Sequence, residues 1–188
     1  MQIKRVSPPS VEPVSLDEAK AYLRIDGTDD DALLTRLIEA ARERAEEYTR
    51  RAFITQEWDA VYDDVTADYI ELPRPPLISV TGVYYTTDAG EQTLATSAYY
   101  VDSISEPGRV ILLSSGWPSR RSKAGLRVRY SAGYGASASS VPGPIRQAII
   151  TAVGDWFEAC GSVAVGEAIN ELPSGAKATL EPYRVRQL

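Results

Sequence analysis

Two pairs of adjacent carboxylates, Asp63–Asp64 and Glu46–Glu47, are the residues of this chain best suited to acid–base chemistry. A carboxylate-dependent hydrolase, for example one that acts on the cell wall, needs two such groups converging on one bond. Adjacent side chains on a strand point to opposite faces, and the sequence pattern places both glutamates on the solvent side of a helix. Neither pair is expected to converge on one bond. A small carboxylate-dependent hydrolase is therefore kept only as an alternative function for this chain.

Histidine is absent from the 188 residues, and Cys160 is the only cysteine. Without an imidazole there is no usual base for a serine or cysteine nucleophile, and no histidine ligand for zinc. One thiol forms neither a disulfide within the chain nor a thiolate metal site. We therefore expect no catalytic residues, no tightly bound metal and no cofactor, and we expect Cys160 to lie in the core.

Three further motifs have simpler explanations than a functional site. The acids at Asp26 and Asp29–Asp31 resemble half a calcium loop, but the glycine comes too early and a helix N-terminus accounts for them. Ser174–Lys177 matches the S-x-x-K of Ser/Lys acyl-enzymes without their other elements. Gly133–Gly135 lacks the third glycine of a dinucleotide-binding loop, so we expect a flexible exit from a sheet.

Nucleic-acid binding is another possible function, with Arg120–Lys123 as a basic loop. Affinity for nucleic acid comes largely from neutralised phosphates, and a net charge of −6 argues against wrapping it over the whole surface. The same acidity allows a polyanion to pass close by without adhering. No apolar run approaches the roughly 20 residues that span a membrane, so no membrane partner is expected.

The first part of the chain is expected to be helical. Ser15–Glu18 is a capping box that begins one helix, and Arg42–Glu46 is an i, i+4 ion pair that supports the next. The second helix has an apolar stripe at helical spacing, formed by Leu34, Leu37, Ile38, Ala41, Ala45 and Tyr48. Its opposite side carries Arg36, Glu39, Glu43, Glu47 and Arg50.

Hydrophobic alternation replaces the helical period between Phe53 and Gly133, where short strands rich in aromatic and β-branched residues predict an antiparallel sheet or small barrel. Pro144 then begins a third helix with an apolar stripe that includes Trp156. The expected fold class is α+β: a small helical bundle with an inserted antiparallel β subdomain and an extended C-terminal tail. The helical core is expected at 13–51 and 144–160, the β insert at 53–133, and the C-terminal loop and tail at 161–188.

Six motifs occur together in a recognisable order, at Pro13–Asp26, Asp30–Leu34, Arg51–Trp58, Leu72–Leu77, Arg129–Gly135 and Val141–Ile145. With them, roughly residues 13–160 resemble the phage head–tail connector (adaptor) family, in its long form with a β insert, as found in prophages and gene transfer agents. The resemblance implies a ring of about twelve copies under the portal, around a channel through which DNA passes without specific binding. It also implies contact with a stopper or tail-completion protein, and a place in a virion assembled in the bacterial cytoplasm.

The resemblance brings no catalytic residues, but it directs attention to two surfaces. In the family the C-terminal segment reaches the portal, and residues 176–188 are locally basic on an acidic protein. We expect this segment to be unfixed in the isolated subunit and to become ordered on the portal. The candidate portal-binding residues are Lys177, Tyr183, Arg184, Arg186 and Leu188, and the candidate ring interface is Arg36, Glu39, Glu43 and Glu47.

Overall fold

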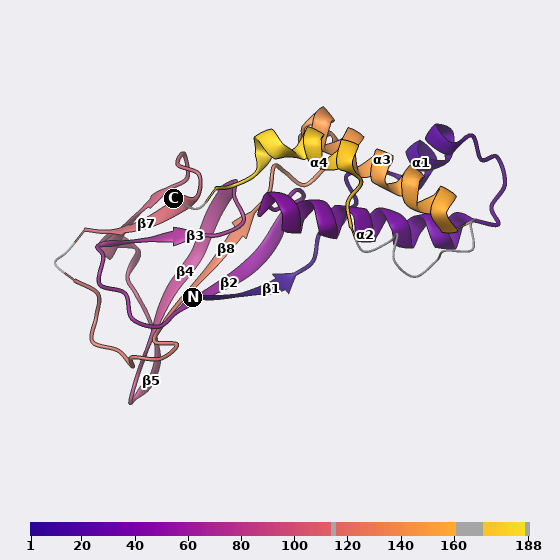
Figure 1. Ribbon diagram of the computed structural model, residues 1–188. Helices are drawn as coiled ribbons and strands as arrows, with labels where there is room; N and C mark the ends of the chain where they lie inside the picture. Colours follow the sequence, from indigo (N-terminus) through magenta and orange to yellow (C-terminus); the bar gives the residue numbers. More distant parts are fainter. Residues whose placement is uncertain (114–115, 161–170, 187–188) are drawn as a thin grey trace. The chain divides into compact units, whose positions relative to one another are not determined.

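The computed structural model describes residues 1–113, 116–160 and 171–186. The chain forms two compact units, which we call the β unit (Met1–Pro9 and Thr55–Tyr134) and the helical unit (Ser10–Ile54 and Gly135–Leu188) (Figure 1). Helices and antiparallel strands both contribute, so the expected α+β class is confirmed. Over the described ranges, no helix combines the length and the apolar character that a membrane crossing requires.

The described residues of the helical unit form four α-helices: α1 (Leu16–Leu23), α2 (Asp31–Thr49), α3 (Gly143–Cys160) and α4 (Ser174–Leu180). The capping box at the start of α1 is confirmed: Ser15 Oγ accepts from Glu18 N at 3.2 Å, and Glu18 Oε2 accepts from Ser15 N at 2.8 Å. This reciprocal pair satisfies two of the backbone donors that a helix N-terminus leaves open. A short 3-10 helix, η2 (Ala138–Ser140), precedes α3, and another, η3 (Glu181–Tyr183), follows α4.

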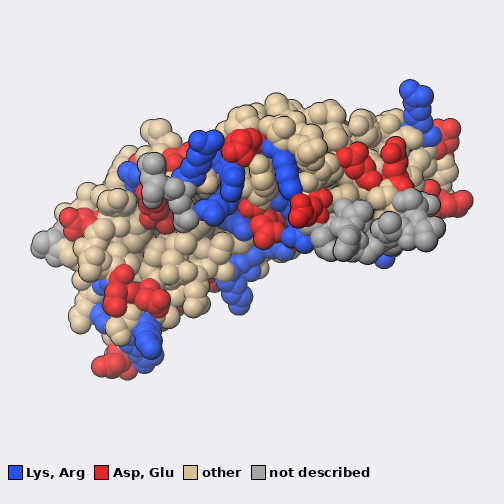
Figure 2. All heavy atoms as spheres, viewed as in Figure 1, with Lys and Arg blue, Asp and Glu red and all other residues tan. Residues whose placement is uncertain are grey.

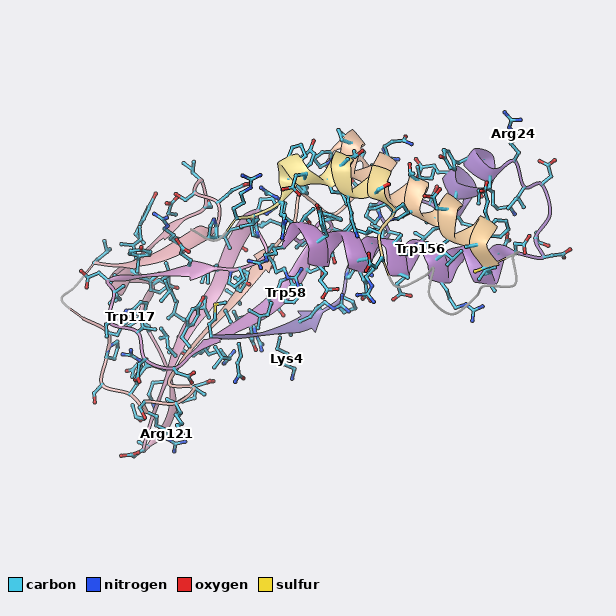
Figure 3. All side chains as sticks on the ribbon, in the orientation of Figure 1. Lys4, Arg24, Trp58, Trp117, Arg121 and Trp156 are labelled. Atoms are coloured by element: carbon cyan, nitrogen blue, oxygen red, sulfur yellow. The ribbon has the colours of Figure 1, made fainter. Side chains whose placement is uncertain are left out.

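The core of the helical unit lies where the apolar stripes of α2 and α3 pack on each other. Trp156 of α3 (labelled in Figure 3) is buried, and its indole Nε1 donates to Glu171 O at 3.1 Å. A buried indole N–H otherwise lacks a partner, so this bond lets the large side chain enter the core. The other buried apolar residues of the two helices are Leu34, Leu37, Ile38, Ala41, Ala45, Ile145, Ala148, Ile149, Ala152 and Val153.

In the part of the β unit that the structure describes, the strand pairs are antiparallel, as expected, and they form two sheets. The larger sheet has the order β1–β2–β8–β4–β5 and the smaller one β3–β7–β6. The strands of the larger sheet are β1 (Gln2–Ser7), β2 (Gln56–Tyr62), β8 (Leu126–Ala132), β4 (Leu77–Thr87) and β5 (Gly90–Thr93). Those of the smaller sheet are β3 (Tyr69–Leu72), β7 (Gly108–Leu112) and β6 (Tyr99–Asp102), with the 3-10 turn η1 (Thr96–Ala98) before β6.

The register of the larger sheet separates an apolar face from a charged one. Trp58 of β2 lies opposite Tyr130 of β8, and both are buried. Tyr130 OH donates to Pro73 O at 2.8 Å, and burial raises the pKa of this phenol.

The two sheets approach closely at Gly108 of β7, where a Cβ would lie 2.6 Å from Leu77 Cβ of β4. Glycine is therefore required at 108 by packing between the sheets.

Two parts of the chain differ from expectation. β1 pairs with β2 at the edge of the larger sheet, although every residue of β1 is exposed and its sequence gives no clear alternation. The C-terminal segment is helical over Ser174–Tyr183, so the expectation of an extended tail is wrong for these residues. Ala176 and Leu180 are buried, and this burial stabilises α4 where local sequence alone predicts little helix.

Candidate functional site

The residues considered for catalysis are separated or have structural roles. Asp63 and Asp64 are exposed, and Asp63 Oδ1 accepts from Ala124 N at 2.8 Å, which fixes a loop. Glu46 is buried whereas Glu47 is exposed, so these two carboxylates point in different directions, and the expectation that both face solvent is wrong. Within residues 1–113, 116–160 and 171–186 no cluster of three or more potential metal ligands occurs.

The residues of the other candidate motifs also have structural explanations. Lys177 Nζ of the S-x-x-K sequence lies 2.9 Å from Glu171 Oε2, so this side chain forms an ion pair at the surface. Gly133 and Gly135 both adopt positive φ in the exit from β8, as expected for a turn. Cys160 is at the end of α3 and only partly buried, so the expectation that it is a core residue is wrong.

The basic loop 120–123 does not form a continuous cationic surface. Arg120 is held by two backbone carbonyls, Pro118 O at 3.2 Å and Val65 O at 2.9 Å. Arg121 (labelled in Figure 3) and Lys123 are exposed. On the face shown in Figure 2, basic side chains gather near the middle with acidic ones among them, and more acidic side chains lie toward the right end. Such a mixed surface has little of the phosphate-neutralising character of a nucleic-acid binder.

A buried ion cluster is the main electrostatic feature of the helical unit. Arg42 of α2 has a side chain only 2% exposed, and it donates to Glu12 Oε2 at 2.7 Å and to Glu46 Oε2 at 3.0 Å. Glu46 Oε1 in turn accepts from Phe53 N at 2.8 Å. Burial raises the pKa of Glu12, and the hydrogen bond and charge of Arg42 oppose this rise. The Arg42–Glu46 pair, expected from i, i+4 spacing to be a helix-surface pair, is instead a core element.

The C-terminal segment is fixed to the end of α2 by three hydrogen bonds. Tyr48 OH donates to Glu181 Oε2 at 2.6 Å, Arg51 Nε donates to Tyr183 O at 2.6 Å, and Val185 N donates to Thr49 O at 2.9 Å. The bond from Tyr48 lowers the pKa of Glu181. The expectation that this segment is unfixed in the isolated subunit is therefore wrong for residues 174–186.

The candidate portal-binding residues are placed as follows. Arg184 and Arg186 are exposed, and both lie near Glu181, at 3.9 and 3.4 Å. The Arg184 guanidinium also covers the ring of Tyr48, with 5.3 Å between its central carbon and the ring centre. Tyr183 is half-buried, and Leu188 lies outside the described residues.

The candidate ring-interface residues share one exposed surface of α2. Arg36, Glu39, Glu43 and Glu47 are all exposed. Arg44 Nη1 lies 3.1 Å from Glu47 Oε2, and Arg42 Nη2 lies 3.8 Å from Glu43 Oε1. This acidic ridge is on the outside of the helical unit, where a partner can reach it, and exposed pairs of this kind contribute little to folding.

A groove that sequence reasoning did not find lies beside this ridge. It has a volume of about 420 Å³ and is lined mostly by apolar atoms from residues 11–16, from Thr35 and Ile38 of α2, and from Ala136–Ala138. The lining residues come from three separate segments, so only the folded chain assembles them. The hydrophobic stripe of α2 was visible in the sequence, but the contribution of Ile38 to the lining of a groove was not.

A family model described as phage gp6-like head-tail connector protein matches residues 13–106. The chain belongs to this family of head–tail connectors, and the resemblance inferred from the sequence motifs is confirmed. No curated protein sequence matches the chain significantly.

Solved structures of gene transfer agent (GTA) particles contain chains of the same fold. One chain, from the virion of a native GTA particle, is 25% identical with a TM-score of 0.81, and the match covers 100% of this chain and 98% of that one. Chains in the neck of an empty GTA particle computed with C6 symmetry and in the neck of a native particle computed with C12 symmetry are each 24% identical. Their TM-scores are 0.82 and 0.79, with the same coverage of both chains.

Proposed function

We propose that this connector is the adaptor in the neck of a phage-like particle, where it joins the portal protein to a stopper or tail-completion protein and performs no catalysis. The observation that carries the proposal is the match along the whole chain to a protein of a GTA virion, at 25% identity and a TM-score of 0.81. A match over both units supports a shared role for the entire chain, the β unit as well as the helical unit.

In this proposal the adaptor forms a ring of about twelve copies, the number suggested by the C12 symmetry of one similar neck. DNA passes through the central channel without specific binding, which suits a chain of net charge −6 with mixed surface charges. The acidic ridge of Arg36, Glu39, Glu43 and Glu47 contributes to contacts between copies. Assembly takes place in the bacterial cytoplasm, and the finished ring is part of the virion.

The portal contact in this proposal is made by the C-terminal segment, through Lys177, Tyr183, Arg184, Arg186 and Leu188. The exposed arginines of this segment are the support for it, since they offer charged donors to acidic groups of a partner. Because the segment is already packed on α2, it needs little further ordering when it binds the portal. This lowers the entropic cost of portal binding.

Electron microscopy of the purified protein mixed with its portal protein tests the proposal. We expect closed rings of one size stacked on the portal. If the protein neither forms rings nor binds the portal, the adaptor function is wrong. A hydrolase assay on purified cell wall, run beside it, addresses the alternative, and activity that disappears in Asp63→Asn/Asp64→Asn would favour that alternative.

A further inference from the structure

The smaller sheet of the β unit presents an exposed apolar surface. Tyr69 of β3, Ile111 of β7 and Tyr100 of β6 are directly opposite one another in the strand register, so their side chains share one face. Leu113 is in the bend directly after β7 and adds another exposed apolar side chain next to this face. Tyr100 and Leu113 are 56% and 66% exposed. We call these four residues the apolar sheet face.

This face is held in place by its own polar contacts. The Arg109 guanidinium lies over the Tyr69 ring at 5.1 Å and pairs with Glu71 Oε1 at 3.1 Å. In the adjoining turn, Asp102 Oδ1 accepts from Ile104 N at 3.0 Å and from Ser105 N at 3.1 Å. This turn presents Ile104 with 90% of its surface exposed. A rigid surface rich in tyrosine and aliphatic side chains is typical of the centre of a protein interface.

A concave apolar surface of suitable size is available on the same chain. The groove of the helical unit has a volume of about 420 Å³, whereas a cavity of roughly 150 Å³ already accommodates a benzene molecule. It can therefore accept two or three large side chains. Val11, at its mouth, is itself exposed, so apolar surface extends outward from the groove.

Ring symmetry requires two unlike surfaces that fit each other. A ring of more than two copies is built head to tail, so each copy offers one surface to the copy before it and a different one to the copy after it. The chain is acidic, with a net charge of −6, and its copies repel one another at a distance. An apolar centre to the contact offsets this repulsion, and the apolar sheet face and the groove are two unlike surfaces with that character.

We infer that the apolar sheet face of one copy docks into the groove of the helical unit of the next copy. The inference rests on the proposed ring and names the surfaces that build it. The acidic ridge then borders the contact, because Thr35 in the groove and Glu39 on the ridge are one helical turn apart on α2.

Two variants test the inference, one for each surface. Tyr100→Arg places a charge in the apolar sheet face, and Thr35→Trp fills the groove; both sites are exposed, so the fold should be retained. Matched controls are Ile78→Arg, on an exposed apolar position of β4, and Ala32→Trp, on an exposed position of α2 outside the groove. Circular dichroism and thermal unfolding check the fold, and sedimentation velocity and native mass spectrometry measure assembly with and without portal.

We expect each test variant alone to lose ring assembly, with self-association weakened by at least about tenfold, while the two controls assemble like the wild type. An equal mixture of the two test variants should form a one-to-one dimer and nothing larger, because the intact sheet face of the Thr35→Trp variant fits the intact groove of the Tyr100→Arg variant. A second contact between a sheet face and a groove is not available to this mixture, because the remaining copy of each surface carries the substitution.

Rings formed by either test variant as readily as by the wild type would overturn the inference. It is also wrong if both variants block assembly but their mixture gives no dimer, since the two surfaces then do not meet each other. A wild-type protein that forms no ring, alone or on portal, contradicts the proposed function instead, so the two failures are distinguishable.

Discussion

Arg42 of α2 and Glu12 lie 30 positions apart in the chain, yet Arg42 Nε donates to Glu12 Oε2 at 2.7 Å. This contact fastens the segment before α1 to the long helix α2. Arg42 also pairs with Glu46, and Glu46 Oε1 accepts from the backbone N–H of Phe53. Through these contacts the Arg42 guanidinium links the segment before α1 to the segment after α2. Val11 and Glu12 belong to the groove, so the same ion pair positions one wall of it.

Replacing Arg42 by alanine should lower the free energy of unfolding by about 3–5 kcal/mol, because Glu12 and Glu46 are left without their cation in a buried site. Urea denaturation measures this loss. Arg44→Ala is the matched control on the same helix, since Arg44 pairs with Glu47 at the surface and its removal should cost about 0–1 kcal/mol. Equal effects of the two substitutions would show that the cluster is not a core element.

Truncating Leu180 to alanine should destabilise the helical unit by about 2–5 kcal/mol, because this side chain is fully buried in a segment that packs on the bundle. Ala178→Ser, on the exposed side of the same helix, should change the free energy of unfolding by less than about 0.5 kcal/mol. Guanidinium titrations of both variants give the comparison. A Leu180→Ala protein as stable as the wild type would mean that the segment is loosely attached.

Asp59 should make the β unit sensitive to acid. The hydrogen bond from Arg129 and the charge of the nearby Arg127 hold the pKa of Asp59 below its usual 3.8. A lowered folded-state pKa stabilises the fold fully above the unfolded value, and this contribution is lost as pH falls below 3.8 and through the folded-state pKa. Stability measured from pH 7 down to pH 2 should therefore fall less steeply for Asp59→Asn in the acidic range. Parallel curves for the two proteins would contradict the assignment.

Reversing charge on the acidic ridge should affect assembly more than folding. Glu43→Lys/Glu47→Lys changes two exposed side chains, so thermal unfolding should shift little, by the equivalent of about 0–1 kcal/mol. Binding between copies should weaken, which sedimentation with portal can detect. Asp155→Lys/Glu158→Lys, at exposed positions of α3, provides a control with the same change in net charge. Normal rings from the Glu43/Glu47 variant would exclude the ridge from the interface.

Charge reversal at the C-terminal arginines should weaken portal binding without unfolding the segment. Arg184→Glu/Arg186→Glu leaves Leu180 and the Arg51–Tyr183 backbone contact in place. We expect co-sedimentation with portal to fall, while the melting temperature changes by no more than a few degrees. Arg121→Glu/Lys123→Glu, at exposed positions of the β unit, is a control of equal charge change. Undiminished portal binding would show that another surface of the protein makes the portal contact.

Local patterns in the sequence determined much of this protein. The capping box at Ser15, the apolar stripes of α2 and α3 and the alternation between Phe53 and Gly133 depend on interactions within a few residues, which repeat at the period of a helix or a strand. The order of the family motifs also identified a head–tail connector, because those motifs mark helix starts and turns, which are local features of the sequence.

The tertiary structure alone decided which residues share a site. Arg42 has the sequence environment of a surface ion pair, and only the return of Glu12 to α2 buries it. The short helix at Ser174–Leu180 is too short to be stable by itself and exists because Leu180 enters the bundle. The apolar sheet face depends on strand register, and the groove depends on three distant segments meeting, so both arise from long-range packing that no local pattern encodes.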